Sequence, residues 1–238
     1  MNKIFSAAIG AASLGLVTAA QAAPQLFVNV YENNVIVSSL SGSSTSGFLT
    51  FEGVTPSFIV SGNTSGGFTS SDPTFTTQQF MISGRVGSTF VSPTTLRFEF
   101  SQTGIDSSAA GGLAASFAST FTANFLTNGQ LVQSVSLANY ADANNTAFAQ
   151  QQLLATRTYT DGPTEDSGAI MGSAVLPNAL FSETSVITAV FTGAAARLQT
   201  STQLAAVPVA VPEPASLALF GAGLLGLGMV RRQRHKAV

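Results

Sequence analysis

Apolar and polar residues alternate over several short stretches in the central part of the chain. The clearest example is Leu96-Arg97-Phe98-Glu99-Phe100, where the three apolar side chains share one face and the two charged side chains share the other. A period of two predicts a half-buried β-strand with Arg97 and Glu99 facing solvent. Comparable runs predict further strands at residues 26–31, 35–40, 48–51, 57–60, 75–82 and 181–191.

One pair of runs has an ambiguous period. Phe117, Phe121 and Phe125 are spaced by four, which fits one face of a helix and also one face of a strand. The Asn-Gly pair that follows, at residues 128 and 129, is the strongest short signal for a β-hairpin turn, and apolar residues alternate after it. We therefore expect residues 116–126 and 130–138 to pair as a hairpin.

Stretches rich in Ser, Gly, Thr and Asn separate these runs and predict loops at residues 41–47 and 61–73. Residues 147–155 are compatible with either a short helix or a strand. Short strands divided by turn signals, with little helix, indicate an all-β domain. The expected architecture is an antiparallel, jelly-roll-like β-sandwich, and a closed β-barrel is the alternative.

The same part of the chain carries few charges. Residues 23–206 hold ten acidic residues against four arginines, hence a net charge of −6, and they contain no Lys, His, Cys or Trp. A nucleic-acid partner requires a cationic surface, so this class of partner is excluded. Without His, Lys or Cys there is also no Ser–His pair, no Schiff-base lysine, no thiolate and no disulfide. We expect no catalytic residue, no cofactor and no enzyme activity.

Carboxylate chemistry is the class that this composition leaves open, as a glycosidase-like pair of acids or as an oxygen-ligand cation site. The densest acidic loop contains Asp161, Glu165 and Asp166, which are candidates for Ca²⁺ ligands. The loop lacks the spacing of known calcium-binding loops, and a solvated turn is the simpler interpretation. We therefore expect no bound metal.

The amino-terminal 22 residues have the three parts of a secretory signal peptide. Lys3 provides the basic start, residues 4–17 are apolar, and Ala20-Gln21-Ala22 is a small-residue cleavage site. We expect signal peptidase to cut between Ala22 and Ala23, because a cut after Ala23 would place Pro24 directly at the cleaved bond. The sequence therefore predicts export of the domain that follows.

The carboxyl-terminal residues 211–238 form a second processing region. Pro212 and Pro214 each hold φ near about −65°, so Glu213 is displayed on an extended stretch. Residues 215–230 are apolar and as a helix span roughly 24 Å, which is shorter than the ~30 Å hydrocarbon core. We expect a membrane helix there, preceded by a Ser/Thr/Ala/Pro linker at residues 200–210.

A basic tail follows the apolar run, and by the positive-inside rule it stays in the cytoplasm. Its cationic residues are Arg231, Arg232, Arg234 and Lys236. Residues 221–226 match the dinucleotide-binding pattern G-x-G-x-x-G, but no strand precedes them and no βαβ unit surrounds them. Small residues inside a membrane helix explain this match, so no nucleotide cofactor is expected.

The order Pro212-Glu213-Pro214, Gly/Leu-rich apolar helix and arginine cluster resembles the PEP-CTERM sorting signal of exported proteins from Gram-negative bacteria. The resemblance implies processing at or near Pro212–Pro214 by an exosortase, a membrane protease, after a transient stay in the inner membrane. It also implies a setting in which extracellular polysaccharide is made. The resulting domain organisation is a signal peptide at 1–22, a β-sandwich at 23–199, a linker at 200–210 and the sorting signal at 211–238.

These features lead to two functional expectations. The first is an exported, non-enzymatic surface or extracellular-matrix protein, a structural or adhesive component of the extracellular polymer or biofilm layer. The alternative is a secreted carbohydrate-binding or carboxylate-dependent carbohydrate-active module, which as an enzyme would need two acids roughly 5–10 Å apart in a cleft. The expected partners are signal peptidase, an exosortase-type protease, the inner membrane and extracellular polysaccharide.

Overall fold

The computed structural model describes residues 24–67, 69, 71–88, 90–160 and 164–207. The predicted signal peptide, the Pro212–Pro214 motif, the membrane helix at 215–230 and the basic tail lie outside these residues. Within the described part of the chain, no helix is both long enough and apolar enough to cross a membrane.

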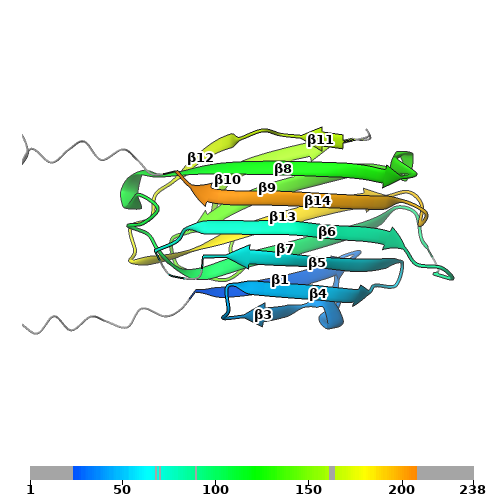
Figure 1. Cartoon of the computed structure of the whole chain (residues 1–238), viewed down its shortest axis with the longest axis horizontal. Helices are drawn as coiled ribbons and strands as arrows, with labels where there is room; N and C mark the ends of the chain where they lie inside the picture. Colours follow the sequence, from blue (N-terminus) through cyan, green and yellow to red (C-terminus); the bar gives the residue numbers. More distant parts are fainter. Residues whose placement is uncertain (1–23, 68, 70, 89, 161–163, 208–238) are drawn as a thin grey trace, which may run out of the picture.

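The described residues fold into two seven-stranded antiparallel sheets that pack face to face (Figure 1). Sheet A consists of β1 (Gln25–Glu32), β2 (Val35–Ile36), β3 (Gly42–Ser44), β7 (Thr94–Asp106), β9 (Val132–Asp142), β10 (Gln152–Tyr159) and β13 (Leu180–Phe191). Sheet B consists of β4 (Phe48–Val54), β5 (Phe58–Gly66), β6 (Thr74–Gly84), β8 (Ala115–Thr127), β11 (Thr164–Asp166), β12 (Ile170–Ala174) and β14 (Arg197–Ala206). Short 3₁₀ turns lie at η1 (Ser38–Leu40), η2 (Gly112–Ala114) and η3 (Gly129–Leu131).

This arrangement confirms the predicted all-β sandwich. Each sheet keeps its own edge strands, β10 and β2 in sheet A and β11 and β4 in sheet B, so the chain does not close into a barrel. The ambiguous period of four belongs to a strand, because Phe117, Phe121 and Phe125 all point inward from β8. Alternation therefore decides the conformation wherever one face of a strand is buried.

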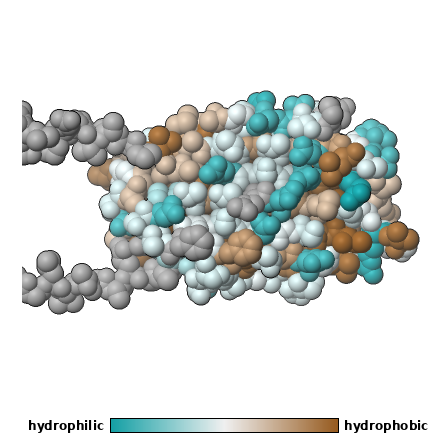
Figure 2. Space-filling view, viewed as in Figure 1, coloured by the Kyte–Doolittle hydropathy of each residue, from teal (hydrophilic) through white to brown (hydrophobic). Residues whose placement is uncertain are grey.

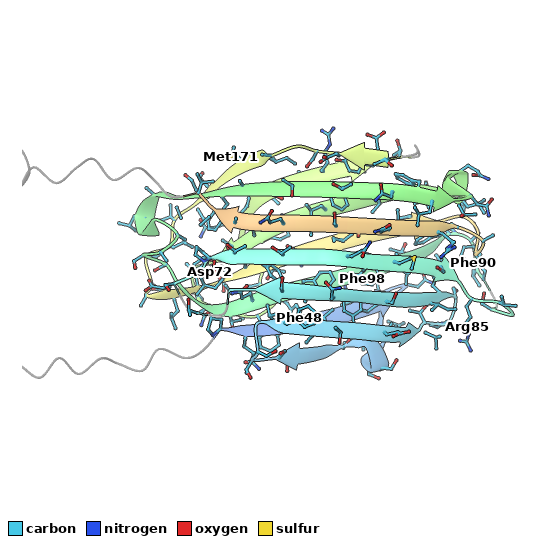
Figure 3. The ribbon with its side chains drawn as sticks, viewed as in Figure 1. Phe48, Asp72, Arg85, Phe90, Phe98 and Met171 are labelled. Carbon is cyan, nitrogen blue, oxygen red and sulfur yellow. The ribbon has the colours of Figure 1, made fainter. Side chains whose placement is uncertain are left out.

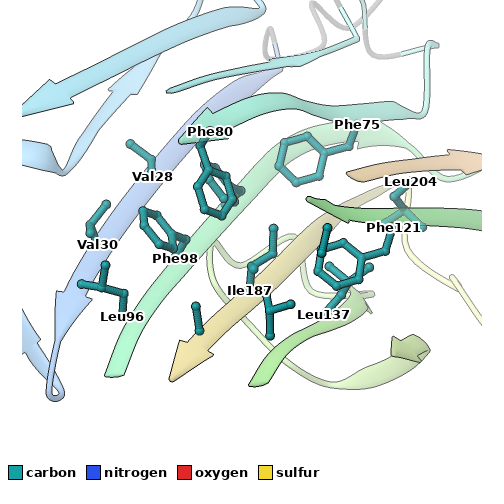
Figure 4. Packing of buried hydrophobic residues seen from close by; sticks show 14 of the residues in the cluster. Val28, Val30, Phe75, Phe80, Leu96, Phe98, Phe121, Leu137, Ile187 and Leu204 are labelled. Carbon is teal, nitrogen blue, oxygen red and sulfur yellow. The ribbon is translucent and has the colours of Figure 1, made fainter. Parts of the chain in front are cut away.

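Aromatic rings from both sheets fill the space between them (Figure 4). Phe80 of sheet B packs on Phe98 of sheet A with ring centroids 4.3 Å apart, and Phe58 packs on Phe191 at 4.5 Å. These rings are fully buried, and they occupy the inward positions that the alternating sequence predicts. The core therefore replaces the cross-links that a chain without cysteine cannot form.

The predicted hairpin of residues 116–126 and 130–138 is wrong in its pairing. Both strands exist, but β8 pairs with β14, β11 and β12 in sheet B, whereas β9 pairs with β13 and β10 in sheet A. Asn128, with φ of 51°, and η3 carry the chain across from one sheet to the other. Each of the two strands has one apolar face. The strands lie in opposite sheets with these faces turned toward the shared core, instead of pairing as neighbours in one sheet.

Three segments that were predicted as loop or linker also prove to contain strands. Strand β3 lies within the predicted loop at residues 41–47 and pairs with β1. Strand β5 continues to Gly66, into the predicted loop at residues 61–73, and β14 fills residues 200–206 of the predicted linker. The polar residues of β5 and β14 alternate between an outer and an inner face, and Thr64 and Thr202 are buried. Residues 152–155, at the end of the ambiguous stretch, are a strand as part of β10. The folded domain therefore extends beyond residue 199, to the end of β14.

The first and last described strands reach the same end of the sandwich (Figure 1). Leu26, at the start of β1, lies next to Gly66, at the end of β5. The Ala206 N–H, at the end of β14, donates a hydrogen bond to the Pro73 carbonyl oxygen at 3.0 Å. We call this the terminal end, and the opposite end, which carries the β1–β2 and β6–β7 connections, the distal end.

A matched pair of glycine substitutions tests the close packing at the distal end. A Cβ on Gly84 would overlap the carbonyl oxygen of Ala194, whereas a Cβ on Gly42 would meet nothing within 4 Å. We expect Gly84→Ala to lower the free energy of unfolding by about 3 kcal/mol, because backbone atoms must move apart. Gly42→Ala should change it by less than about 1 kcal/mol. Urea unfolding of both variants measures the difference, and equal effects would contradict this packing.

Candidate functional site

The outer face of sheet B is a broad polar surface with few charged residues, among them Glu52 on the edge strand β4 and Arg197 at the start of β14. Met81 of β6 pairs with Ser61 of β5 and with Gln199 of β14, and Gln199 pairs in turn with Asn124 of β8, so a row of outward side chains crosses the sheet. Figure 2 shows this face as largely hydrophilic or neutral. We call it the polar face, and its hydroxyl and amide residues include Thr50, Ser61, Asn63, Ser65, Gln79, Thr120, Thr122, Asn124, Gln199, Ser201 and Gln203.

A shallow trough of about 310 Å³ lies near the middle of the polar face. Amide side chains supply most of its polar atoms, and it is lined by Ser61, Gly62, Asn63, Gln79, Met81 and Gln199. The β5 backbone at Gly62 lies directly on the core, since a Cβ there would come within 2.5 Å of Phe80 and 2.6 Å of Phe51. The side-chain oxygen of Asn63 is occluded and has no hydrogen-bond partner among the described residues. The trough therefore offers uncharged donors and acceptors to a ligand.

Two acidic residues that a carboxylate enzyme could use are instead bound within the fold. The Glu32 carboxylate accepts hydrogen bonds from Ser57 Oγ at 2.7 Å and from the Ser57 N–H at 3.2 Å. Asp142 accepts a hydrogen bond from the Thr146 N–H at 2.9 Å. Both carboxyl groups are buried, and they come from different ends of sheet A. Neither forms a pair of acids facing a cleft.

The prediction that Arg97 and Glu99 face open solvent is wrong for Glu99. Arg97 Nη1 lies 2.8 Å from Glu99 Oε1, and the Glu99 side chain is only 7% exposed. The Arg97 guanidinium lies over the Tyr31 ring at 4.2 Å from the centroid, so neighbouring strands cover the pair. Burial and the adjacent Glu99 raise the pKa of Tyr31. We interpret this cluster as structural, because Arg97 and Tyr31 both engage the Glu99 carboxylate.

The acidic loop considered for Ca²⁺ does not form a compact cluster in the described residues. Glu165 and Asp166 lie on β11 at the edge of sheet B, and Asp161 lies outside the described residues. Asp166 Oδ1 accepts a hydrogen bond from the Gly168 N–H at 3.0 Å, as in a turn. Within the described ranges, no three residues of the types His, Cys, Asp and Glu are grouped so that they would hold a metal.

Sequence reasoning missed Glu183, the most unusual acid in the fold. Its side chain is fully buried between the sheets, and neither carboxyl oxygen has a hydrogen-bond partner among the described residues. Burial raises the pKa of this carboxyl well above its ordinary value, and the negative charge of Asp72 raises it further. The sequence did contain a signal for its burial, because Glu183, Ser185 and Ile187 are alternate residues of one strand and therefore face the same side, the side of the apolar inward residues.

The fold and the carboxyl-terminal signal together define a class, an exported protein with a two-sheet β domain. Residues 210–233 match the family model described as the PEP-CTERM protein-sorting motif. The chain therefore carries this motif, which confirms the predicted sorting signal and implies processing by an exosortase and export to the cell surface or extracellular space. The match covers the tail and not the β domain. No curated protein matches the sequence.

Several solved structures resemble the β domain weakly. The CBM22-1–GH10 modules of the Clostridium thermocellum endo-1,4-beta-D-xylanase 10B, complexed with xylohexaose, are 12% identical, with 56% of this chain and 22% of that chain covered and a TM-score of 0.31. TmCBM61 in complex with beta-1,4-galactotriose is 12% identical, with 69% and 90% covered and a TM-score of 0.31. The enzymatically active domain of bacteriophage CBA120 tailspike protein 4 is 15% identical, with 68% and 20% covered and a TM-score of 0.34.

Proposed function

We propose that the chain is a non-enzymatic component of the cell surface or extracellular matrix, released there after exosortase processing. The sorting motif at residues 210–233 supports the export route. The arrangement of the acids supports a non-enzymatic role, because Glu32, Glu99 and Asp142 are each bound within the fold rather than paired across a cleft. The domain would then act by binding or by filling space in the polymer layer.

The position of both domain ends supports this role further. Strands β1 and β14 both reach the terminal end of the sandwich (Figure 1). While the chain is held by its tail, the distal end is therefore the part of the described domain farthest from the last described strand residue. This geometry leaves the largest surfaces of the sandwich free to contact the surrounding polymer.

A second candidate function, the binding of a neutral polysaccharide, is favoured by the trough on the polar face. Hydroxyl and amide groups hydrogen-bond to sugar hydroxyls, and Met81 supplies an apolar contact at the centre of the trough. The nearest carboxylates of sheet B lie toward its edges, Glu52 on β4 and Asp166 on β11. The trough is lined by uncharged residues of three strands, with Arg197 Nη2 3.6 Å from Met81 Sδ and Glu52 opposite Ser61 at its margin, and it is the single observation that carries this proposal.

Cell fractionation tests the matrix role directly. Antibody against the β domain should detect the protein in the surface and polymer fractions of the producing cells, because the sorting motif directs it there. Retention of all the protein in the inner membrane or the cytoplasm would contradict the proposal. Removal of the gene should weaken or thin the polymer layer without abolishing any hydrolytic activity in the extracellular fraction.

Alanine substitutions test the polysaccharide-binding candidate. We expect Gln79→Ala combined with Gln199→Ala to lower the affinity for the cells' own purified polysaccharide by about 10-fold, because each lost hydrogen bond is worth roughly 0.5–1.5 kcal/mol. Gln203→Ala is the matched control, since Gln203 is exposed on the same face of β14 but does not line the trough. Affinity electrophoresis in gels that contain the polysaccharide measures retention, and equal retardation of both variants and wild type would exclude the trough.

A further inference from the structure

Exposed aliphatic side chains gather at the distal end of the sandwich, which lies at the right in Figure 2 and carries several of the brown patches. They come from β2, from the ends of β4 and β5 beside their shared turn, and from the β6–β7 connection. Val86 is the extreme case, since its residue surface is 99% exposed. Exposed apolar patches commonly mark contact surfaces. The exposed aliphatic residues of this end include Val35, Ile36, Val54, Ile59, Val86 and Val91.

The Val86 side chain projects from an ordered turn in the β6–β7 connection. The Ser88 N–H donates to the Arg85 carbonyl oxygen at 3.2 Å, and Gly87 has a φ of 77°, which is typical of a type II turn. Arg85, next to Val86, is also exposed (Figure 3). Its Nη1 donates to the Thr55 carbonyl oxygen at 3.2 Å, and its other guanidinium N–H groups have no partner among the described residues. The turn of residues 85–88, which we call the knob, therefore presents an aliphatic side chain and a positive charge together.

Two neighbouring hollows lie beside the knob, and we call them together the socket. They have volumes of about 260 Å³ and about 300 Å³, and both are lined by Glu32, Val35 and Pro56. Pro56 lies in the turn that the knob contacts, because the Arg85 N–H donates to the Ser57 carbonyl oxygen at 3.0 Å. The knob and the socket are therefore side by side on the distal end. The remaining apolar lining of the socket is Ile36, Val37 and Val91.

The socket contains a buried carboxylate without a positive partner. Glu32 is only 6% exposed, and the hydrogen bonds that it accepts come from the Oγ and the N–H of Ser57. A carboxylate has about four acceptor sites, so about two of them remain open. No arginine of the described residues forms an ion pair with Glu32, whereas Arg97 forms one with Glu99. Because a buried charge is stabilised by an opposite charge, the socket suits an aliphatic group that carries a cation.

We propose that the socket is occupied by the knob of a second copy of this chain, with Val86 between the apolar walls and Arg85 beside Glu32. The knob supplies the aliphatic group and the positive charge that the socket lacks. Because knob and socket are neighbours on one end, a two-fold axis between them lets each copy insert its knob into the other. Such an exchange closes on itself, so it gives a dimer and not a fibre. The contact surface is small, and we expect a reversible dimer with a dissociation constant above about 1 μM.

The position of the contact gives the dimer a direction. Strands β1 and β14 reach the terminal end, so two copies that meet at their distal ends have their terminal ends pointing apart (Figure 1). Copies held at two different places in the polymer layer would then be joined tip to tip. This consequence rests on the proposed matrix role, whereas the pairing itself does not.

Sedimentation velocity of the protein purified from its producing cells tests the pairing. The sedimentation coefficient should rise from the monomer toward the dimer value between about 10 μM and about 1 mM protein. Val86→Asp should weaken the association at least about 10-fold, because it removes the aliphatic contact and brings a negative charge to Glu32. Leu113→Asp is the matched control, since Leu113 is a 70% exposed aliphatic residue of η2 at the terminal end, and it should associate like wild type. A protein that stays monomeric, or equal weakening by both substitutions, overturns the proposal.

Engineered cysteines locate the contact, because the chain has no cysteine of its own. Val86→Cys places a thiol on the knob, and Val35→Cys places one on the wall of the socket. When the two single variants are mixed and oxidised, they should form a mixed disulfide, since the bond requires Cα atoms within about 7 Å. Leu113→Cys mixed with Val35→Cys is the control and should give far less. Equal yields from the two mixtures, measured by non-reducing electrophoresis and intact mass, overturn the assignment of the contact to the knob and the socket.

Discussion

Replacing Phe98 with alanine is expected to lower the free energy of unfolding by about 3–5 kcal/mol, since a large cavity would open in the centre of the core. The Phe98 ring is fully buried, and it contacts Phe80 at 4.3 Å and Phe51 at 6.3 Å between ring centroids. Both partners come from sheet B, so the substitution removes contacts that hold the two sheets together. Because the chain contains no cysteine, packing of this kind and not a disulfide holds the two layers together.

Phe48→Ala is the matched control for this prediction. Phe48 lies at the start of the edge strand β4 and is 45% exposed, whereas Phe98 is at the centre of the fold (Figure 3). We expect Phe48→Ala to cost less than about 1 kcal/mol. Urea unfolding followed by far-ultraviolet circular dichroism measures both variants. A cost at Phe98 no larger than that at Phe48 would mean that the two sheets do not share this core.

Strands with strict alternation were predictable from sequence because their conformation is decided locally. Residues 96–100 form part of β7, and residues 75–82 lie within β6, as the alternating pattern indicates. The pairing of strands was not predictable in the same way. Asn128 and Gly129 favour a tight turn, but the partners of β8 and β9 are set by apolar faces far apart in the chain.

Polar strands were the other source of error. Composition alone identified residues 61–66 and 200–206 as loop and linker, because Ser, Thr, Asn and Gln are common in both loops and solvent-facing sheets. The structure shows that Ser61 and Asn63 face outward while Val60 and Thr64 are buried. The trough also depends on the register of β5, β6 and β14, which no local pattern specifies.

Glu183 illustrates what sequence parity can and cannot reveal. Its position on the inward face of β13 follows from alternation, since Ile187 and Ala189 share that face. The presence of Gln102 beside it follows only from the pairing of β13 with β7. By contrast, the sorting motif at residues 210–233 is a contiguous signal, so it was identified without any tertiary information.

Replacing Glu213 and both flanking prolines with alanine is expected to abolish processing almost completely. The prolines keep the segment extended, and an extended backbone is what a protease active site requires. Without them, the alanine-rich sequence would extend the apolar helix toward its amino end. The cleavage point would then lie within a helix instead of on an extended segment. The intact mass of the triple variant should then run to Val238, and the protein should remain in the membrane fraction. The wild-type protein from the extracellular fraction should have a mass that ends near Pro212–Pro214.

Pro208→Ala is the matched control for the processing prediction, because Pro208 belongs to the same tail but lies outside the matched residues 210–233. This variant should be processed and released like wild type, since the extended Pro-Glu-Pro segment is intact. Release of the triple variant with the wild-type mass would show that the protease does not recognise this segment. A wild-type mass that runs to Val238 in both fractions would instead make the tail a permanent anchor, because a basic end held in the cytoplasm retains the apolar segment in the membrane.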